Sequence, residues 1–271
     1  MEQHGTVDRG DGVRLAYAHL PGLGPTVVFL PGYGSDMAGA KALALQGWCA
    51  AHGQALLRLD YSGHGASGGA FADGTIGRWT DDAAAVVERL FPAGPMILVG
   101  SSMGGWIALL LALRLGERVA GVVGVAAAPD FTERLMWDAM ASSERAALLR
   151  DGFLDVPSAY GPTQQVTRAL IEDGRRHLLL GGRIALRVPV RLLQGQADPD
   201  VPWETALALA AAIEGADIRI VLVKDGDHRL SRPADLALLT GLVGGLLGVG
   251  AFSGEDGGEA LAERGIAPMM G

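Results

Sequence analysis

The sequence contains very little cysteine and lysine. Cys49 is the single cysteine among 271 residues, which excludes an intrachain disulfide and a zinc site built from several thiolates. It lies in an apolar stretch, where a buried and inert thiol is expected. The only lysines are Lys41 and Lys224, and the arginines are dispersed along the chain, so no basic patch stands out. Because the net charge is −8, we expect no nucleic-acid partner.

Long apolar runs are missing as well. No stretch approaches the roughly 20 residues that span a bilayer, so we expect no stable membrane insertion. The first residues also lack the basic and apolar regions of a secretion signal, and a cytoplasmic protein is predicted. The chain is 49% hydrophobic and 19% charged, with 41 glycines, a composition typical of a compact globular protein. The sequence leaves the oligomeric state open.

Short apolar runs alternate with helical patterns along most of the chain. Residues 13–19 alternate like an antiparallel strand, and runs at 26–30, 55–59, 96–99, 119–126, 190–193 and 218–223 predict further strands. Helical spacing is found at 41–51, 81–90, 103–115, 204–213 and 234–247. This alternation predicts an α/β fold with a mostly parallel sheet covered by helices on both faces.

The alternation stops between residues 130 and 186. Helical patterns at 133–141, 143–150 and 164–172 are joined there by loops at Gly152 and 156–162, and no strand-like run is expected. We therefore predict a core in two parts, 1–129 and 187–248, separated by a helical cap, or lid, at 130–186. Residues 249–271 are rich in glycine and acidic side chains and predict a peripheral tail.

The main candidate for chemistry is the segment Gly100-Ser101-Ser102-Met103-Gly104, which has a G-x-S-x-G pattern. A predicted strand precedes it and a predicted helix follows it, which is the setting of a nucleophile elbow. So tight a turn strains the serine backbone and needs very small residues two positions away on each side. The register therefore selects Ser102 rather than Ser101 as the nucleophile, next to the positive end of the following helix.

A serine hydroxyl needs a base to remove its proton, and six histidines are available. His228 follows the last predicted strand, which agrees with the chain order of serine, acid and histidine that accompanies this elbow. His64 lies in a glycine-rich loop after an early strand. It could line the rim of a pocket, but it precedes the nucleophile. We predict that His228 is the base.

The acid should follow a strand between the serine and the histidine. Two aspartates, Asp198 and Asp200, compete in the loop after the predicted strand at 190–193. Asp200 lies nearer the next helix and could cap it, so we favour Asp198 as the group that orients His228 and stabilises the imidazolium.

An oxyanion hole requires two backbone donors. One is the amide of Met103, directly after the predicted nucleophile. The glycine-containing loop Leu30-Pro31-Gly32-Tyr33-Gly34 follows an earlier strand, and we predict that the Tyr33 amide is the second donor.

The stretch from Pro31 to about Leu242 resembles one subfamily of α/β hydrolases, that of the mitochondrial acyl-glucuronide esterase and palmitoyl-protein thioesterase with its bacterial relatives. The segments that carry the resemblance are Ser35-Asp36-Met37, Lys41-Ala42-Leu43-Ala44, Asp60-Tyr61-Ser62-Gly63, Val99-Gly100-Ser101-Ser102-Met103-Gly104-Gly105-Trp106, Gly124-Val125-Ala126, Pro157-Ser158, His177-Leu178-Leu179, Val201-Pro202-Trp203 and Asp227-His228-Arg229. The resemblance implies the α/β-hydrolase fold with its eight-stranded sheet and a triad of Ser102, Asp198 and His228. We expect no transit peptide, unlike in the mitochondrial members, and the chain also departs from the subfamily in having Gln194 where many relatives have histidine and in its acidic tail.

These observations predict a serine hydrolase that cleaves carboxylic esters or thioesters through an acyl-enzyme intermediate. The expected acyl chains are medium or long, of the palmitoyl-thioester or acyl-glucuronide type, on a small molecule or an acylated peptide. No cofactor or metal is expected. Four residues of the insertion are predicted to contact substrate: Trp137, Met140, Phe153 and His177. The alternatives are a carbon–carbon bond hydrolase of the same fold and a non-catalytic binding module.

Overall fold

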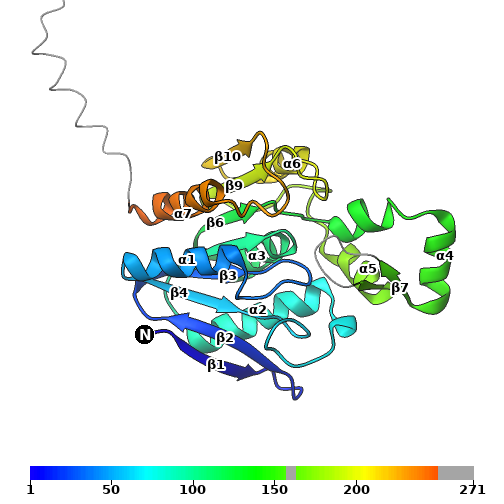
Figure 1. Ribbon diagram of the computed structural model, residues 1–271, viewed down its shortest axis with the longest axis horizontal. Helices are drawn as coiled ribbons and strands as arrows, with labels where there is room; N and C mark the ends of the chain where they lie inside the picture. The colour runs from blue at the N-terminus through cyan, green and yellow to red at the C-terminus, as the bar shows by residue number, and fades with distance from the viewer. Residues whose placement is uncertain (157–162, 250–271) are drawn as a thin grey trace, which may run out of the picture.

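The computed structural model describes residues 1–156 and 163–249. They form one large sheet with helices on both faces, and a group of shorter elements lies to one side of it (Figure 1). Pro157, Ser158 and nearly all of the predicted tail at 249–271 lie outside the described residues.

The large sheet has eight strands in the order β1-β2-β4-β3-β5-β6-β9-β10. Their bounds are β1 (Gln3–Asp8), β2 (Arg14–Leu20), β3 (Leu23–Leu30), β4 (Gln54–Leu59), β5 (Met96–Ser101), β6 (Val119–Val125), β9 (Val190–Gly195) and β10 (Ile218–Val223). The pairs β1–β2 and β2–β4 are antiparallel, and the remaining neighbours are parallel. The predicted mostly parallel, eight-stranded sheet is confirmed.

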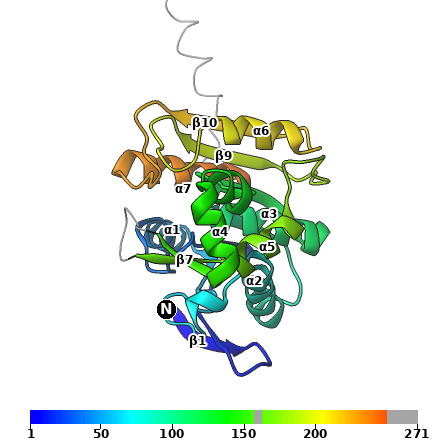
Figure 2. The same cartoon turned by 90° about the vertical axis from the view of Figure 1, so that its right-hand side faces the viewer.

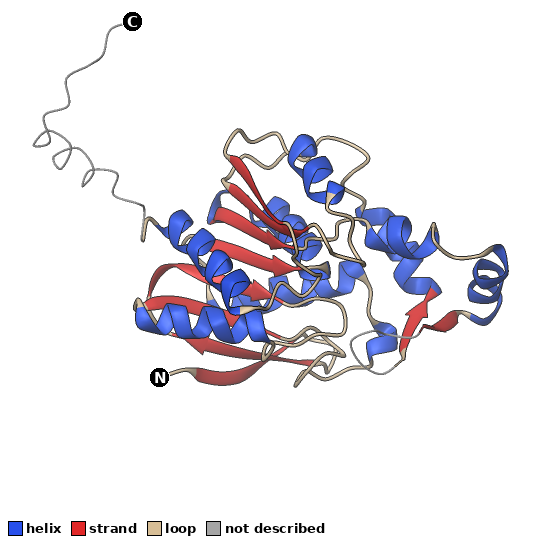
Figure 3. Cartoon of the chain, turned by 45° about the horizontal axis from the view of Figure 1, so that its top comes forward, coloured by secondary structure: helices blue, strands red, loops and turns tan. Residues whose placement is uncertain are grey.

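Helices cover the two faces of the sheet (Figure 3). One face packs against α1 (Ala40–Ala51) and α7 (Pro233–Leu247), and the other against α2 (Ile76–Leu90), α3 (Met103–Leu115) and α6 (Glu204–Ala212). In β3, Val27 and Phe29 face the first group of helices, while Val28 and Leu30 face the second. Since both faces are buried, the strand is a continuous apolar run rather than an alternating one.

The insertion between β6 and β9 contains strands as well as helices. Its elements are the π-helical turn η3 (Thr132–Trp137), α4 (Ser142–Asp151), β7 (Phe153–Val156), β8 (Gln164–Thr167), α5 (Arg168–Gly174) and the 3₁₀ turn η4 (Arg175–His177). The antiparallel pair β7–β8 shows that the expectation of no strand here was wrong. Thr167 accepts a hydrogen bond from the Leu170 amide and so caps α5, which is why the helix begins at Arg168 rather than at Gln164.

The two ends of the insertion are joined to each other, and the second is also joined to the core. The carboxylate of Asp130, at the beginning of the insertion, accepts hydrogen bonds from the Leu179 and Leu180 amides at 2.7 and 2.8 Å. The indole nitrogen of Trp106 on α3 donates to the His177 carbonyl at 3.1 Å. Asp130 is 2% exposed, so these charge-assisted bonds are shielded from water. Figure 2 views the molecule from the side on which the insertion lies, with α4 in front.

No helix within residues 1–156 and 163–249 is long and apolar enough to cross a membrane.

Candidate active site

Ser102 lies between β5 and α3 in a strained backbone conformation. Its φ is 54° and its ψ is −119°, a region that a residue with a Cβ atom rarely adopts. A methyl group built on Gly100 would lie 2.1 Å from the Gly104 carbonyl oxygen, and one on Gly104 would lie 2.0 Å from that of Leu30. Both contacts are with backbone atoms, which could move away only if the chain itself shifted. The two glycines therefore permit the sharp turn that presents the Ser102 side chain.

The structure brings Ser102, His228 and Asp198 into one hydrogen-bonded row. His228 Nε2 lies 3.1 Å from Ser102 Oγ, and His228 Nδ1 lies 2.9 Å from Asp198 Oδ2. The three side chains come from the loops that follow β5, β9 and β10, and the carboxyl ends of these parallel strands meet at one edge of the sheet. Residues far apart in the sequence are thus in contact.

Asp198 is held by more than the histidine. Its Oδ1 accepts hydrogen bonds from the Asp200 and Val201 amides at 2.8 and 2.9 Å. Burial raises the pKa of the Asp198 carboxyl, but the bond with His228 and these amides outweigh it, so the pKa lies below its ordinary value. Asp198 therefore carries the negative charge that faces the imidazole. Asp200 contributes its backbone amide to this arrangement.

The loop after β3 lies against the serine. A methyl group built on Gly32 would lie 3.4 Å from Ser102 Cβ and 3.2 Å from the Ser101 carbonyl oxygen. The loop turns back through a hydrogen bond from the Ser35 amide to the Gly32 carbonyl at 3.1 Å. Tyr33, the predicted second oxyanion donor, is therefore next to a residue in contact with Ser102. The roles of the Tyr33 and Met103 amides stay predictions.

The four predicted substrate-contacting residues do not share one environment. Trp137 and Met140 pack against the small core of the insertion, which is formed by Leu148, Val166 and Ile171. Phe153 is 43% exposed. Their contact with substrate, and that of His177, stays a prediction.

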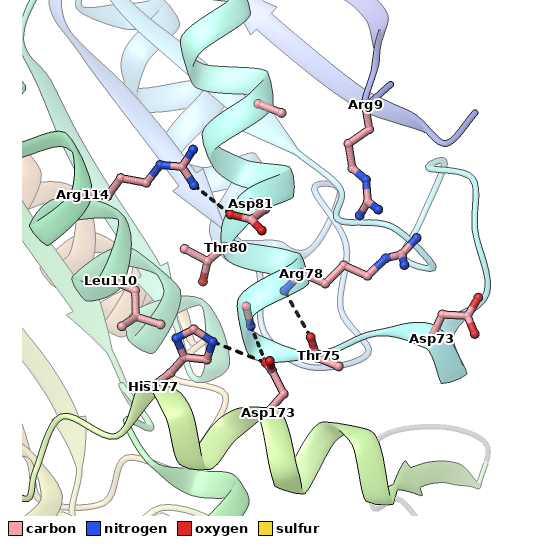
Figure 4. A pocket seen from close by; sticks show the side chains of 12 residues that line it. Arg9, Asp73, Thr75, Arg78, Thr80, Asp81, Leu110, Arg114, Asp173 and His177 are labelled. Carbon is pink, nitrogen blue, oxygen red and sulfur yellow. Dashed lines mark hydrogen bonds and ion pairs between the residues drawn. The ribbon is translucent and has the colours of Figure 1, made fainter. Parts of the chain in front are cut away.

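His177 lines a cavity of about 910 Å³ beside the start of α2. Figure 4 shows its side chain near Asp173, which also accepts the Gly77 amide at 2.7 Å. The wall of this cavity includes three arginines, at positions 9, 78 and 114, but none of Ser102, Asp198 and His228. The cavity is therefore separate from the hydrogen-bonded row.

Sequence reasoning missed the roles of two polar residues near the site. In the sequence, Gln194 stands out as a polar residue at the end of a buried strand and as a departure from the subfamily, but neither signal gave it a role. Its side-chain nitrogen lies 3.0 Å from Asp198 Oδ2, and the residue is 1% exposed. His64 could line a pocket rim by its loop position, but it is 3% exposed and lies beneath the loop after β3.

One group of potential metal ligands occurs among the described residues, and it overlaps the same site. Ligand atoms of Asp198, Asp200 and His228 lie within 4.8 Å of one another. Both oxygens of Asp198 already accept hydrogen bonds from the protein, so a metal ion there would have to displace these donors.

Comparisons of the sequence and of the structure with known proteins both find hydrolases. Residues 24–168 match the Hydrolase_4 family, described as serine aminopeptidase, S33. The human mitochondrial palmitoyl-protein thioesterase ABHD10 is 37% identical over 235 residues, which cover 86% of this chain and 76% of that protein. A crystal structure of a hydrolase from Agrobacterium vitis S4 is 44% identical with a TM-score of 0.85, covering 91% and 98% of the two chains. Mouse α/β-hydrolase domain-containing protein 10 is 35% identical with a TM-score of 0.84 and the same coverage.

Proposed function

Because the chain belongs to the Hydrolase_4 family of α/β hydrolases, we propose that it is a serine hydrolase that cleaves carboxylic esters or thioesters of medium or long acyl chains through an acyl-enzyme intermediate. The observation that carries this proposal is the row of hydrogen bonds from Asp198 through His228 to Ser102. These are the contacts that nucleophile, base and orienting acid require.

In the first half of the reaction, His228 Nε2 accepts the proton of Ser102 as Oγ attacks the acyl carbon. The carbonyl oxygen becomes an oxyanion, which the Met103 and Tyr33 amides stabilise. Each such donor contributes roughly 3 kcal/mol. Asp198, at 2.9 Å from Nδ1, fixes the tautomer and stabilises the imidazolium. Collapse of the intermediate expels the thiol or alcohol, which takes the proton from His228, and leaves Ser102 acylated.

In the second half, a water molecule replaces the leaving group. His228 removes one of its protons as the water oxygen attacks the acyl carbon of the ester on Ser102. The second tetrahedral intermediate is stabilised by the same two amides. Its collapse releases the carboxylic acid and returns the proton to Ser102 Oγ, which regenerates the free enzyme.

We assign residues 130–186 as a cap that contributes to the acyl site. Its strand β8 approaches the loop after β3, since a methyl group on Gly34 would lie 2.3 Å from Gln164 Nε2, and the Tyr33 hydroxyl donates to the Gln165 carbonyl at 3.1 Å. Because Gly32 in this loop adjoins Ser102, an acyl chain bound to the serine would lie close to the cap. The ABHD10 relatives are named palmitoyl-protein thioesterases, which supports testing long acyl thioesters first. They are also named mitochondrial, and the cytoplasmic location of this chain stays a prediction.

A fluorophosphonate probe tests the reaction class. It should label the wild-type protein at Ser102, identified by peptide mass spectrometry, and should not label Ser102→Ala. Failure to label a folded wild-type protein would favour a non-catalytic binding module.

Substrate class needs a second experiment. We would compare acyl-CoA, acyl-cysteine peptides, acyl glucuronides and p-nitrophenyl esters from acetyl to dodecanoyl, each below its aggregation limit. Each buried methylene contributes up to about 0.8 kcal/mol. With imperfect burial, we expect kcat/KM to rise roughly two-fold per methylene until the pocket is full. A steady fall from acetate onwards would exclude the long-acyl proposal but not the triad.

A further inference from the structure

His64 is a buried imidazole that the reaction described above does not use. It lies in the loop after β4 and is 3% exposed. The rings of Tyr61, Phe71 and Trp79 surround it, with centroids 5.6, 5.0 and 5.1 Å from that of the imidazole. Because the imidazole is enclosed, water does not compete for its two nitrogens. The protein groups that bond to these nitrogens therefore show which of them carries the hydrogen.

The two nitrogens of His64 have backbone partners that fix its tautomer. Nε2 lies 3.2 Å from the Gly34 amide nitrogen, and an amide N–H can only donate, so Nε2 accepts. Nδ1 lies 3.2 Å from the Ser62 carbonyl oxygen, which can only accept, so Nδ1 carries the hydrogen. The imidazole is therefore neutral. A proton on Nε2 would turn the contact with Gly34 into one between two donors.

Burial agrees with this assignment. It lowers the pKa of the His64 imidazole, although the Ser62 carbonyl and the carboxylates of Asp82 and Asp36 act in the opposite direction. Asp82 accepts the Ser62 amide and hydroxyl at 2.8 and 2.6 Å, so its charge is shared with donors other than the imidazole.

The Gly34 amide belongs to the loop that adjoins Ser102. Gly32, two residues before it, lies against Ser102 Cβ, and Tyr33 between them supplies the proposed oxyanion donor. The loop after β4 also holds this segment at its other end, because the Tyr61 hydroxyl donates to the Pro31 carbonyl at 3.3 Å. Gly34 itself has a φ of 66°, a region that glycine enters at no steric cost, so contacts such as that with His64 help to select one orientation of its flexible backbone.

We propose that His64 is a positioning residue that holds the Gly34 amide through its neutral imidazole and thereby keeps the Tyr33 amide directed at the oxyanion. This inference rests on the proposed function, since it assumes that the loop stabilises an oxyanion on the acyl group of Ser102. His64 does not touch the substrate. It acts by fixing the loop in advance, so that no reorganisation is needed as the charge develops.

Two substitutions separate the contacts of His64. The oxygen of the glutamine side chain in His64→Gln can occupy the place of Nε2 and accept from the Gly34 amide. The shorter amide in His64→Asn can occupy the place of Nδ1 and donate to the Ser62 carbonyl. Each variant retains one hydrogen bond and loses one, so a purely structural role predicts similar losses in both. Thermal unfolding of each variant shows whether it is folded.

We expect His64→Asn to lower kcat by about ten- to hundred-fold with little change in KM, because a misdirected oxyanion donor costs up to 10²–10³-fold. His64→Gln should stay within about three-fold of the wild type. Affinity for a trifluoromethyl ketone of the same acyl length, which forms a tetrahedral adduct with serine, should fall in parallel with kcat. Equal kcat values for the two variants would overturn the proposal.

Hydrogen exchange gives a readout that does not depend on turnover. The amides of the peptide spanning 32–34 should exchange at least ten-fold faster in His64→Asn than in the wild type, and near the wild-type rate in His64→Gln. If the wild-type protein hydrolysed no ester and took no probe at Ser102, the proposed function would fail, and the exchange rates would still decide whether His64 holds the loop. Unchanged exchange in His64→Asn would exclude the positioning role even in an active enzyme.

Discussion

The side-chain amide of Gln194 and the imidazole of His228 meet at the same oxygen, Oδ2 of Asp198, at 3.0 and 2.9 Å. Gln194 is 1% exposed, and its nitrogen also lies 3.3 Å from the Gly195 and Val201 carbonyl oxygens. These acceptors set the orientation of the amide, which places a neutral donor beside the carboxylate. The geometry of the acid therefore depends on a residue outside the proposed triad.

Replacing Gln194 with leucine should impair turnover while the protein remains folded. A hydrogen bond to a charged group contributes about 1.5–3 kcal/mol, so kcat should fall by roughly ten- to hundred-fold, with little change in KM. Gln194→His, which retains a donor of similar reach, is the matched control and should recover most of the rate. Steady-state kinetics on one p-nitrophenyl ester measures both variants. Wild-type kcat in Gln194→Leu would contradict a supporting role for this amide.

Ser102→Ala should lower the rate by roughly four to six orders of magnitude, because the three residues act as a unit and only the oxyanion donors remain. Ser101→Ala is the control in the adjacent position and should keep most of the activity, since the imidazole faces Ser102 Oγ at 3.1 Å. Single-turnover hydrolysis measures both. The opposite order of effects would assign the nucleophile to Ser101.

Asp198→Asn should fold normally and lose about ten-thousand-fold in turnover, because the amide favours the wrong tautomer of His228. Asp200→Asn should lose far less, since Asp200 reaches Asp198 through its backbone amide at 2.8 Å, which the substitution retains. Comparable losses in the two variants would show that both carboxylates serve the histidine.

Activity should decline on acidification, because a protonated His228 cannot accept a proton from Ser102. The pKa of Asp198 lies below its ordinary value of 3.8, so its carboxylate stays ionised at mildly acidic pH. Asp198 stabilises the fold above its unfolded-state pKa, and this contribution is lost only as the pH falls through the lower folded-state value. The pH profile of kcat/KM, measured beside unfolding at each pH, separates the two effects. Constant activity down to pH 4 would exclude a histidine base.

The sequence predicted the core of the fold better than the insertion. Strands such as β3 and β6 are buried on both faces, so their apolar runs are unambiguous, and the predicted bounds of α3 agree with the structure. The edge strand β1 was missed because Gln3–Asp8 is mostly polar and buries only Val7. In the insertion, β7 and β8 have four residues each, too short for a periodic pattern to distinguish them from helix.

Part of the candidate site could likewise be predicted from the sequence, and part could not. Ser102 and His228 were selected by local motif and chain order, and the structure brings them together. The Gln194 amide nitrogen lies 3.0 Å from Asp198, four residues later, and His64 Nε2 lies 3.2 Å from the Gly34 amide of another loop. The residue pattern reports neither contact, because the first depends on how the loop after β9 turns back toward Gln194, and the second on the loops after β3 and β4 meeting at the edge of the sheet.

Tyr33 connects the proposed oxyanion loop with the insertion, and its hydroxyl tests whether the two are coupled. Tyr33→Phe removes the hydrogen bond to the Gln165 carbonyl, 3.1 Å long, and leaves the backbone amide of Tyr33 in place. A neutral hydrogen bond contributes about 0.5–1.5 kcal/mol, so β8 should be held less firmly over the loop. We expect kcat/KM for dodecanoyl esters to fall about three- to ten-fold, within that energy range, while acetyl esters are hydrolysed at nearly the wild-type rate. The acetyl ester is the internal control, because it is too short to need the insertion but requires the same oxyanion donors. An equal loss for both esters would show that the hydroxyl supports the oxyanion loop rather than the acyl site.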